Sequence, residues 1–494
     1  MTKYLPNDYI LLISLGFGLV LFSLNEADTD LFGHLMYGEN ILQSGSLPAL
    51  NSYSYTNPDY PWVNHKWLSS LIFASIYLFS GGSGILIFKI SIFLLIISLL
   101  NSLIKNMHPT VHPLVRYLSL MISAGFLQGG SYPRAHIFTY LFTTLLIWLL
   151  YSKLNQKKFG IALFTIFLFW VNLHGGVIAG FGIFYLWILI TLLQKTRKPG
   201  YSILFWVLTG FLLPIVLIIN PYGINLPIQL FTEMLTDKSV IVEWQPLPIF
   251  TWDYLIFKIL FLALIPISFF WKREIGIFPT VLILITAYLS FRYLRHVPFF
   301  GIAAALAFPL PISEYLTKFG SIIYEISDKI SNRFMKLHYM LKLFSFSVFL
   351  LIMLGPYISK YPDSVNIVLP RGFYPEEHMK WLKENNIKAN ILNSFNWGKY
   401  LTYNLYPNIK VCIDGRFDTA YPETFIIEYF NFFQGNDTSL VFLDKYNHDL
   451  ILMEANSEIT HSLLSHEDWV LLNATEHAAL FAKRTWLSKQ VVTD

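Results

Sequence analysis

About eleven hydrophobic stretches follow one another from Tyr9 to Ile358, and they restrict the chain to a polytopic membrane fold. A membrane-spanning helix needs about 17–25 apolar residues, so these stretches and the short segments between them occupy most of residues 1–359. The expected spans are 9–24, 84–104, 113–129, 136–152, 160–173, 175–193, 201–219, 253–270, 275–290, 297–311 and 343–359. A further apolar segment, 67–82, either crosses the membrane or lies in its interface.

The composition agrees with a membrane location and excludes several other classes. Of the 494 residues, 54% are hydrophobic and 13% are charged, whereas soluble domains carry about 25% charged residues. Residues 360–494 have a soluble composition, so they are expected to form a separate domain after a transmembrane module at 1–359. Basic runs interleaved with aromatic residues are absent, which excludes a nucleic-acid partner. The single cysteine, Cys412, excludes an intramolecular disulfide.

Basic residues in the loops predict the topology. If 67–82 does not cross, sixteen lysines and arginines lie on one side of the membrane and five on the other. The side with more basic residues is cytoplasmic. The N-terminus is then inside a bacterial cytoplasmic membrane, residues 25–83 form a long first extracytoplasmic loop, and the C-terminal domain is outside. A crossing by 67–82 would reverse every later loop.

The first outer loop carries the strongest catalytic candidates. Residues 30–44 have helical periodicity and predict an interfacial helix, on which Asp30 and His34 share one face. Glu26, Asp28 and Asp30 follow the first span closely. Acids near the hydrocarbon boundary suggest function, although helix N-capping by Asp28 or Asp30 is an alternative. Asp28 and Asp30 could also share a divalent cation, Mg²⁺ or Mn²⁺.

The rest of this loop is rich in aromatic residues, which are typical of a membrane interface. Tyr53 and Trp62 are expected to anchor there. His65, three residues after Trp62, is a candidate for substrate binding.

Other polar residues at outer span ends complete the candidate site. Asn172 and His174 lie in a hairpin, where they could bind sugar hydroxyls or form a satisfied buried pair. Glu243 and the neighbouring Trp244 could contact a sugar or only pack within their loop. The remaining candidates are the phosphate-binding arginines and a substrate-binding histidine: Arg134, Arg292, Arg295 and His296.

The C-terminal domain alternates helical and extended patterns and is therefore expected to be an α/β layered domain. Helices are expected at 375–385 and 423–433, and strands at 390–392, 410–413, 449–453, 469–472 and 478–482. Asp414-Gly415-Arg416 at a strand end could contact substrate, but a turn with an internal ion pair is the favoured interpretation.

The acidic segment resembles a motif of the GT-C superfamily of polyprenyl-phosphate-sugar-dependent membrane glycosyltransferases. Asp30, Ile41-Leu42 and Ser44-Gly45 match its spacing, although Leu31 stands where that motif has Glu. The chain is more similar to a bacterial branch of this superfamily. The residues that match this branch are Asp28, Asp30, His34-Leu35, Gly38-Glu39, 170–176, 220–223, Glu243-Trp244, Trp397-Gly398 and 414–416.

This resemblance implies a GT-C-like fold and an outward active site. The protein would transfer a sugar, with inversion, from a polyprenyl-phosphate donor to a hydroxyl of a glycan, lipid or protein acceptor. Asp30 would act as general base, with Asp28 and His34 beside it. Two alternatives remain open: a polymerase or ligase of lipid-linked glycans, and a membrane transporter without chemistry.

The topology can be tested by cysteine labelling. Cysteine at position 157 should react with an impermeant maleimide only after permeabilisation, whereas cysteine at position 437 should react in intact spheroplasts. The unmodified chain, with Cys412 alone, gives the background. Labelling of position 157 from outside would mean that 67–82 crosses the membrane.

Overall fold

The computed structural model describes residues 7–194, 201–252, 254–270, 275–319, 329, 363–433 and 441–491. Its contacts divide the chain into two compact units. The helical unit comprises Met1–Asn25, Ser83–Asn220 and Asp237–Asn366, and the α/β unit comprises Glu26–Gly82, Pro221–Thr236 and Ile367–Asp494. The segment expected to be the first outer loop, 25–83, is thus grouped almost entirely with the C-terminal residues. The predicted domain boundary at 359/360 remains a proposal.

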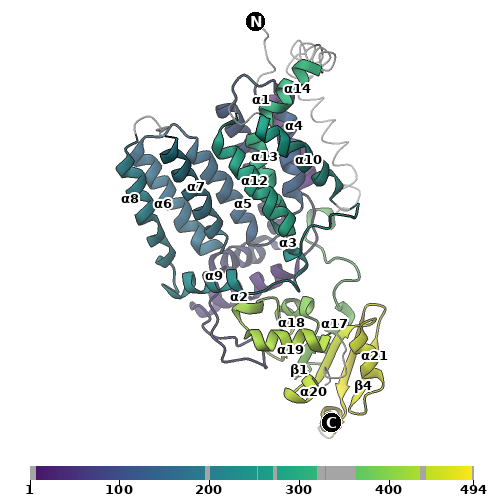
Figure 1. Cartoon of the computed structure of the whole chain (residues 1–494). Helices are drawn as coiled ribbons and strands as arrows, with labels where there is room; N and C mark the ends of the chain where they lie inside the picture. Colours follow the sequence, from purple (N-terminus) through teal and green to yellow (C-terminus); the bar gives the residue numbers. More distant parts are fainter. Residues whose placement is uncertain are drawn as a thin grey trace. The chain divides into compact units, whose positions relative to one another are not determined.

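The helical unit consists of packed apolar helices (Figure 1). Its described elements are α1 (Asn7–Leu21), the second part of α3 (Trp67–Met107), α4 (Pro113–Gln128), α5 (His136–Leu150), α6 (Gln156–Leu173), α7 (Val177–Leu193), α8 (Ile203–Leu212), η1 (Leu213–Ile218), η2 (Val242–Trp244), α10 (Leu255–Phe270), α12 (Ile277–Arg292), η3 (Leu294–His296), α13 (Val297–Ala307), α14 (Pro309–Phe319) and η4 (Asp363–Val365).

Small residues bring α13 close to α4. At Gly301, an added Cβ would lie 2.7 Å from the Cβ of Phe126 and 2.9 Å from the backbone oxygen of Ser123. Small residues allow such close helix packing in membrane proteins. The run Ala303-Ala304-Ala305 is likewise buried in this contact region.

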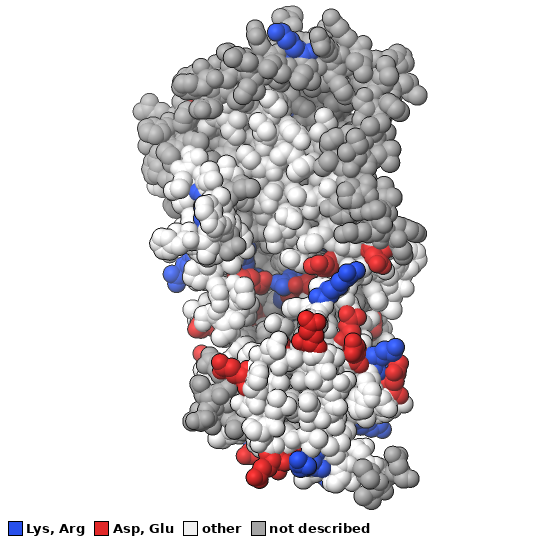
Figure 2. All heavy atoms as spheres, turned by 90° about the vertical axis from the view of Figure 1, so that its right-hand side faces the viewer, with Lys and Arg blue, Asp and Glu red and all other residues white. Residues whose placement is uncertain are grey.

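The helices coincide with most of the expected spans, but the number of spans remains a prediction. Among the described residues, one helix, Trp67–Met107, is both long and apolar enough to cross a membrane; others, such as His136–Leu150 and Val177–Leu193, are apolar but shorter. The expected span at 343–359 lies outside the described residues. Phe211 and Leu193 are 79% and 74% exposed, and Figure 2 shows wide areas of surface without Lys, Arg, Asp or Glu. A surface with few charges and exposed apolar side chains suits contact with lipid.

Helix α3 is interrupted where the two units meet in the sequence. Gly81 has φ 63° and ψ −158°, so regular helix ends before it and resumes after it. A residue with a side chain would rarely adopt this conformation. The uncertain segment 67–82 is therefore helical, and the part before Gly81 is shorter than the roughly 17 residues that a span needs.

The α/β unit is built on a five-stranded sheet flanked by helices (Figure 1). The strands are β1 (Ala389–Asn393), β2 (Ile409–Val411), β3 (Leu450–Glu454), β4 (Trp469–Ala474) and β5 (Ala478–Lys483), in the order β2-β1-β3-β5-β4. Strand β1 is parallel to β2 and β3, whereas β5 is antiparallel to β3 and β4. The helices are α2 (Thr29–Ser44), the first part of α3, α9 (Asn225–Leu235), α17 (Glu376–Glu384), α18 (Gly398–Leu405), α19 (Glu423–Phe433), α20 (Val441–Lys445), α21 (Glu458–Leu464) and α22 (Arg484–Val491), together with the short turns η5 (Phe395–Trp397) and η6 (Phe417–Thr419).

All five strands expected in the C-terminal domain are confirmed, with ends shifted by no more than two residues. The helices expected at 375–385, 423–433 and 30–44 correspond to α17, α19 and α2. Helix α18 was not expected from the sequence. It begins within Trp397-Gly398, and it supplies a residue of the candidate site.

Candidate functional site

The two aspartates that precede and begin α2 have different partners. Asp28 is the N-cap, and its Oδ1 accepts a hydrogen bond of 2.9 Å from the backbone N–H of Asp30. This is the capping role that the sequence allowed as an alternative. The side chain of Asp30 instead forms an ion pair with the Nζ of Lys399, which lies on α18.

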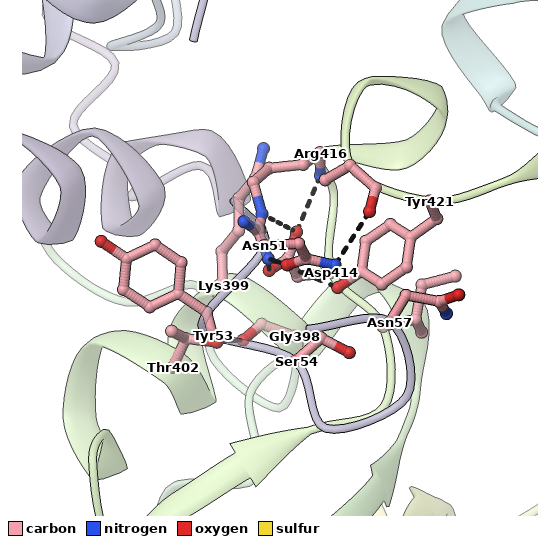
Figure 3. A network of polar contacts seen from close by, with 12 residues as sticks. Asn51, Tyr53, Ser54, Asn57, Gly398, Lys399, Thr402, Asp414, Arg416 and Tyr421 are labelled. Atoms are coloured by element: carbon pink, nitrogen blue, oxygen red, sulfur yellow. Dashed lines mark hydrogen bonds and ion pairs between the residues drawn. The ribbon is translucent and has the colours of Figure 1, made fainter. Parts of the chain in front are cut away.

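Lys399 is buried, with a side chain 7% exposed, while the Asp30 side chain is 23% exposed. Two glycines leave room for the lysine: an added Cβ would lie 2.9 Å from its Cδ at Gly33 and 3.0 Å from its Nζ at Gly415. Figure 3 shows Lys399 among polar residues near Arg416. The sequence analysis missed Lys399, because its partner lies 369 positions away.

His34 shares a face of α2 with Asp30, as the spacing predicted, but its ring contacts a different partner. Its Nδ1 lies 2.9 Å from the Oγ of Ser70, and its ring stacks on Phe73. Burial lowers the pKa of His34 well below its ordinary value, against the opposing effect of the Asp30 carboxylate. The imidazole is therefore neutral near pH 7 and can donate or accept a hydrogen bond.

His65 is also held by a partner in the α/β unit. Its Nδ1 lies 3.2 Å from the Oε1 of Glu233 on α9, and both side chains are largely buried. Among the described residues, no group of three or more His, Cys, Asp or Glu gathers as a metal site.

The predicted ion pair within Asp414-Gly415-Arg416 is confirmed (Figure 3). The Nε of Arg416 lies 2.9 Å and 3.0 Å from the two carboxylate oxygens of Asp414, and its Nη2 lies 2.8 Å from Oδ2. Arg416 also donates to the side-chain oxygen of Asn51. Burial alone would lower the pKa of the Arg416 guanidinium. The attraction of the Asp414 carboxylate and of nearby phenol groups has a larger effect and raises this pKa above its ordinary value.

Four aromatic rings surround the Arg416 guanidinium. Its Cζ lies 4.7 Å from the ring centre of Trp62 and 5.1 Å from that of Tyr53, with Tyr37 and Tyr421 slightly farther away. The expectation that Tyr53 and Trp62 anchor the chain at a membrane interface was wrong, since they are only 2% and 3% exposed. They pack around a buried cation. The faces of tyrosine and tryptophan rings attract cations, so the same residue types suit both a membrane interface and a cation site.

In the helical unit, two of the three candidate arginines meet at Glu243. The Nη1 of Arg134 lies 2.6 Å from Oε2 of Glu243, and the Nη1 of Arg295 lies 3.7 Å from Oε1. Arg295 also lies over the ring of Trp244, 4.2 Å from its centre. Backbone hydrogen bonds place η2 beside η3: Leu294 donates to Gln245 and Leu247 donates to Phe291.

Arg292 does not join this pair. Its Nε donates to the hydroxyl of Tyr293 at 3.0 Å, and its side chain is exposed. His296, in η3, packs its ring against Trp244 and Phe299. Arg134, Arg295, Glu243 and Trp244 are called the arginine cluster below.

The hairpin residues Asn172 and His174 have local structural partners. Asn172 donates to the backbone oxygens of Leu168 and Ile219 at 2.9 Å and 3.0 Å. The Nδ1 of His174 accepts from the backbone of Gly176 at 3.0 Å and lies 2.8 Å from the Oγ1 of Thr139. Both buried side chains thus have hydrogen-bond partners, which is the structural alternative that the sequence left open.

Comparison with known proteins identifies the fold. No family model matches the sequence, and no curated protein matches it. The structure is similar to the oligosaccharyltransferase of Archaeoglobus fulgidus in its apo form, with a TM-score of 0.59 and 12% identity over 92% of this chain and 70% of that one. It is also similar to the same organism's AglB in complex with an inhibitory peptide and a dolichol-phosphate (TM-score 0.57, 12% identity, 97% and 74% covered). A further similar structure is that of ArnT from Cupriavidus metallidurans bound to undecaprenyl phosphate (TM-score 0.52, 9% identity, 96% and 97% covered).

The chain therefore shares the fold of these proteins, which is the GT-C-like fold that the acidic motif led us to expect, while the expected number of spans stays a prediction. At 9–12% identity, these likenesses establish the fold alone.

The Arg416–Asp414 pair should be essential for the stability of the α/β unit. Changing Asp414 to Asn removes the charge that compensates a buried guanidinium, and the loss should be about 3–5 kcal/mol. The melting temperature of the detergent-purified protein measures it. Glu428→Gln is the matched control, because it breaks an ion pair with Lys445 whose side chains are 49% and 41% exposed, and such pairs contribute about 1 kcal/mol or less. Equal melting temperatures for the two variants would contradict a structural role for Asp414.

Proposed function

We propose that this protein is an integral membrane glycosyltransferase of the bacterial cytoplasmic membrane, with its N-terminus inside and its C-terminal domain outside. It transfers a sugar from a polyprenyl-phosphate donor to an acceptor hydroxyl on the outer face, with inversion. The GT-C fold supports this proposal, since AglB and ArnT have been solved with a dolichol-phosphate and with undecaprenyl phosphate. The observation that carries it is the Asp30 carboxylate, which is paired with a buried lysine and not used to cap its helix.

Asp30 is the proposed general base. As the acceptor oxygen bonds to the anomeric carbon, the carboxylate takes the hydroxyl proton, and the bond between that carbon and the phosphate oxygen breaks. One displacement of this kind inverts the anomeric centre. The reaction needs an unprotonated base, and the ammonium of Lys399 stabilises that charged form. Asp28 fixes the start of α2, and neutral His34 holds the same helix face against Ser70.

The arginine cluster is the proposed site for the donor phosphate. Its two guanidinium groups outnumber its one carboxylate, and the Nζ of Lys238 lies 5.3 Å from the ring centre of Trp244. This excess of positive charge suits an anion, and the phosphate leaves with additional negative charge. Glu243 holds both arginines with their donors side by side. Glu243 would then position the arginines for the phosphate, while Trp244 supports Arg295 from one face.

Transfer of a whole lipid-linked glycan is a second candidate function. The TM-score is higher with the oligosaccharyltransferase, at 0.59, than with ArnT, at 0.52. On this second proposal the donor carries a glycan in place of a single sugar. A panel of donors separates the two proposals.

Replacement of Asp30 by Asn should abolish transfer. Loss of a general base lowers the rate by about 10²–10⁴-fold. The measurement is the consumption of radiolabelled undecaprenyl-phosphate sugars by membranes containing the protein. Asp28→Asn is a matched control, since Asn caps a helix about as well as Asp, and it should retain activity within a few-fold. If Asp30→Asn is as active as Asp28→Asn, Asp30 is not the base.

Binding of the donor should depend on Arg134 and Arg295 but not on Arg292. Changing either cluster arginine to Ala should weaken undecaprenyl-phosphate binding by about 2–5 kcal/mol, and Lys should restore it only in part, because it lacks the planar fork. Binding to purified protein in detergent is measured with each variant. Arg292→Ala serves as the control and should bind like the wild type. Equal losses for Arg292→Ala and Arg295→Ala would remove the cluster from this role.

A further inference from the structure

A cavity of about 240 Å³ lies at one edge of the sheet in the α/β unit, apart from Asp30 and Lys399. Its lining includes two carboxylates, an amide, an imidazole and two aromatic rings: Glu454, Glu476, Asn396, His477, Phe373 and Trp397. The proposed transfer reaction does not account for it, although Trp397 belongs to the Trp397-Gly398 motif.

The position of this cavity follows from the strand order. Strand β1 lies between β2 and β3 and is parallel to both. After β1 the chain forms β2 on one side of it, and later forms β3 on the other side, so the direction of strand order reverses at β1. In open α/β sheets, ligands bind outside the carboxyl ends of strands at such a reversal. Asn396 and Trp397 follow the end of β1, and Glu454 ends β3. Glu476 and His477 precede the start of antiparallel β5, so they reach the same edge.

Glu454 presents an unsatisfied acceptor at this edge. Its Oε1 accepts a hydrogen bond of 2.5 Å from the Oγ of Ser394. Its Oε2 is buried and has no hydrogen-bond partner among the described residues. A buried carboxylate oxygen without a donor costs free energy, so this atom is suited to a ligand that donates a hydrogen bond.

Close contacts hold other lining residues, Gly372, Phe373, Trp397 and His477, in place. Gly372 has a φ of +67°, and an added Cβ would lie 2.6 Å from the Nε2 of His477, so a larger residue would push into the wall. The indole N–H of Trp397 donates to the backbone oxygen of Phe373 at 2.7 Å. The ring of Phe373 is 40% exposed, which leaves an aromatic surface available to a ligand.

We propose that this cavity is a binding site for one hydroxyl-rich sugar unit without a phosphate group. Carboxylates and amides accept hydrogen bonds from hydroxyls, and the exposed phenyl ring offers an apolar surface for one face of a sugar ring. The lining has two glutamates and neither lysine nor arginine, which disfavours phosphate and other anions. A volume just below the range of about 300–1,000 Å³ for drug-sized ligands suits a single sugar unit.

Saturation-transfer NMR on the full-length protein in detergent tests this proposal. The probes are the methyl glycosides of glucose, galactose, mannose, N-acetylglucosamine and glucosamine, with glucose 1-phosphate as the anionic comparison. At least one uncharged or amine-bearing glycoside should bind with a Kd of about 1–10 mM, the range of a few polar contacts, and glucose 1-phosphate should bind more weakly than glucose. Glu454→Gln keeps the acceptor to Ser394 but removes the charge, and it should raise the Kd about tenfold.

Three further variants separate this site from the rest of the protein. Phe373→Ala removes an exposed ring with little risk to folding and should also weaken binding, whereas Trp381→Ala removes another exposed ring and should not. Asp30→Asn should leave binding unchanged, so the result does not depend on the proposed transfer reaction. The proposal is overturned if no glycoside binds, if glucose 1-phosphate binds as well as glucose, or if Asp30→Asn abolishes the signal while Glu454→Gln and Phe373→Ala keep it.

Discussion

Burial of the Arg416 guanidinium is the constraint on which the α/β unit depends. Moving such a charge out of water costs several kcal/mol unless a carboxylate and further donors and acceptors compensate it. Here Asp414 is two residues from Arg416, but Asn51, which also accepts from the guanidinium, is 365 positions away. The aromatic rings of Tyr53 and Trp62 that surround the guanidinium also come from the N-terminal segment. Compensating the charge of this one cation therefore requires two distant parts of the sequence to fold together. The isolated bridge between Ser54 and Val411, on β2, continues the same contact into the sheet.

Helix α2 links the Arg416 guanidinium to the candidate site, because it carries residues that contact both. Asp30, His34 and Tyr37 recur at helical spacing and lie on one face. Each meets a different partner: Lys399, Ser70 and the Arg416 guanidinium. A rotation of α2 that moved Tyr37 away from Arg416 would also move Asp30 away from Lys399. The position of the proposed base is therefore fixed by a packing contact two turns along its own helix.

The sequence predicted what local patterns determine. Short apolar runs located β3 and β5, helical spacing located α2, and the proximity of Asp414 and Arg416 in the sequence predicted their ion pair. Sequence alone could not predict contacts between residues hundreds of positions apart, because no local signal distinguishes Lys399 from any other lysine in an amphipathic helix. The aromatic residues Tyr53 and Trp62 were assigned to a membrane interface for the same reason: their chemistry suits both an interface and a cation, and only the distant Arg416 decides. Arg292 and Arg295 are close in the sequence, but helix α12 ends at Arg292, so their side chains have different partners. Arg295 pairs with Glu243, whereas Arg292 donates a hydrogen bond to the hydroxyl of Tyr293.

The net charges of the two candidate centres suit different substrates. A buried ion pair contributes little net stability compared with apolar side chains of the same size, so stability alone does not explain why a lysine is buried against Asp30. That pair has no net charge, which suits a neutral hydroxyl that approaches a carboxylate base. The arginine cluster has two cations and one carboxylate, and its excess positive charge suits a lipid phosphate. If Lys399 were absent, the Asp30 centre would carry a full negative charge and would repel a phosphorylated donor. Lys399 thus neutralises the charge of the proposed base, which suits a protein whose proposed donor is an anion.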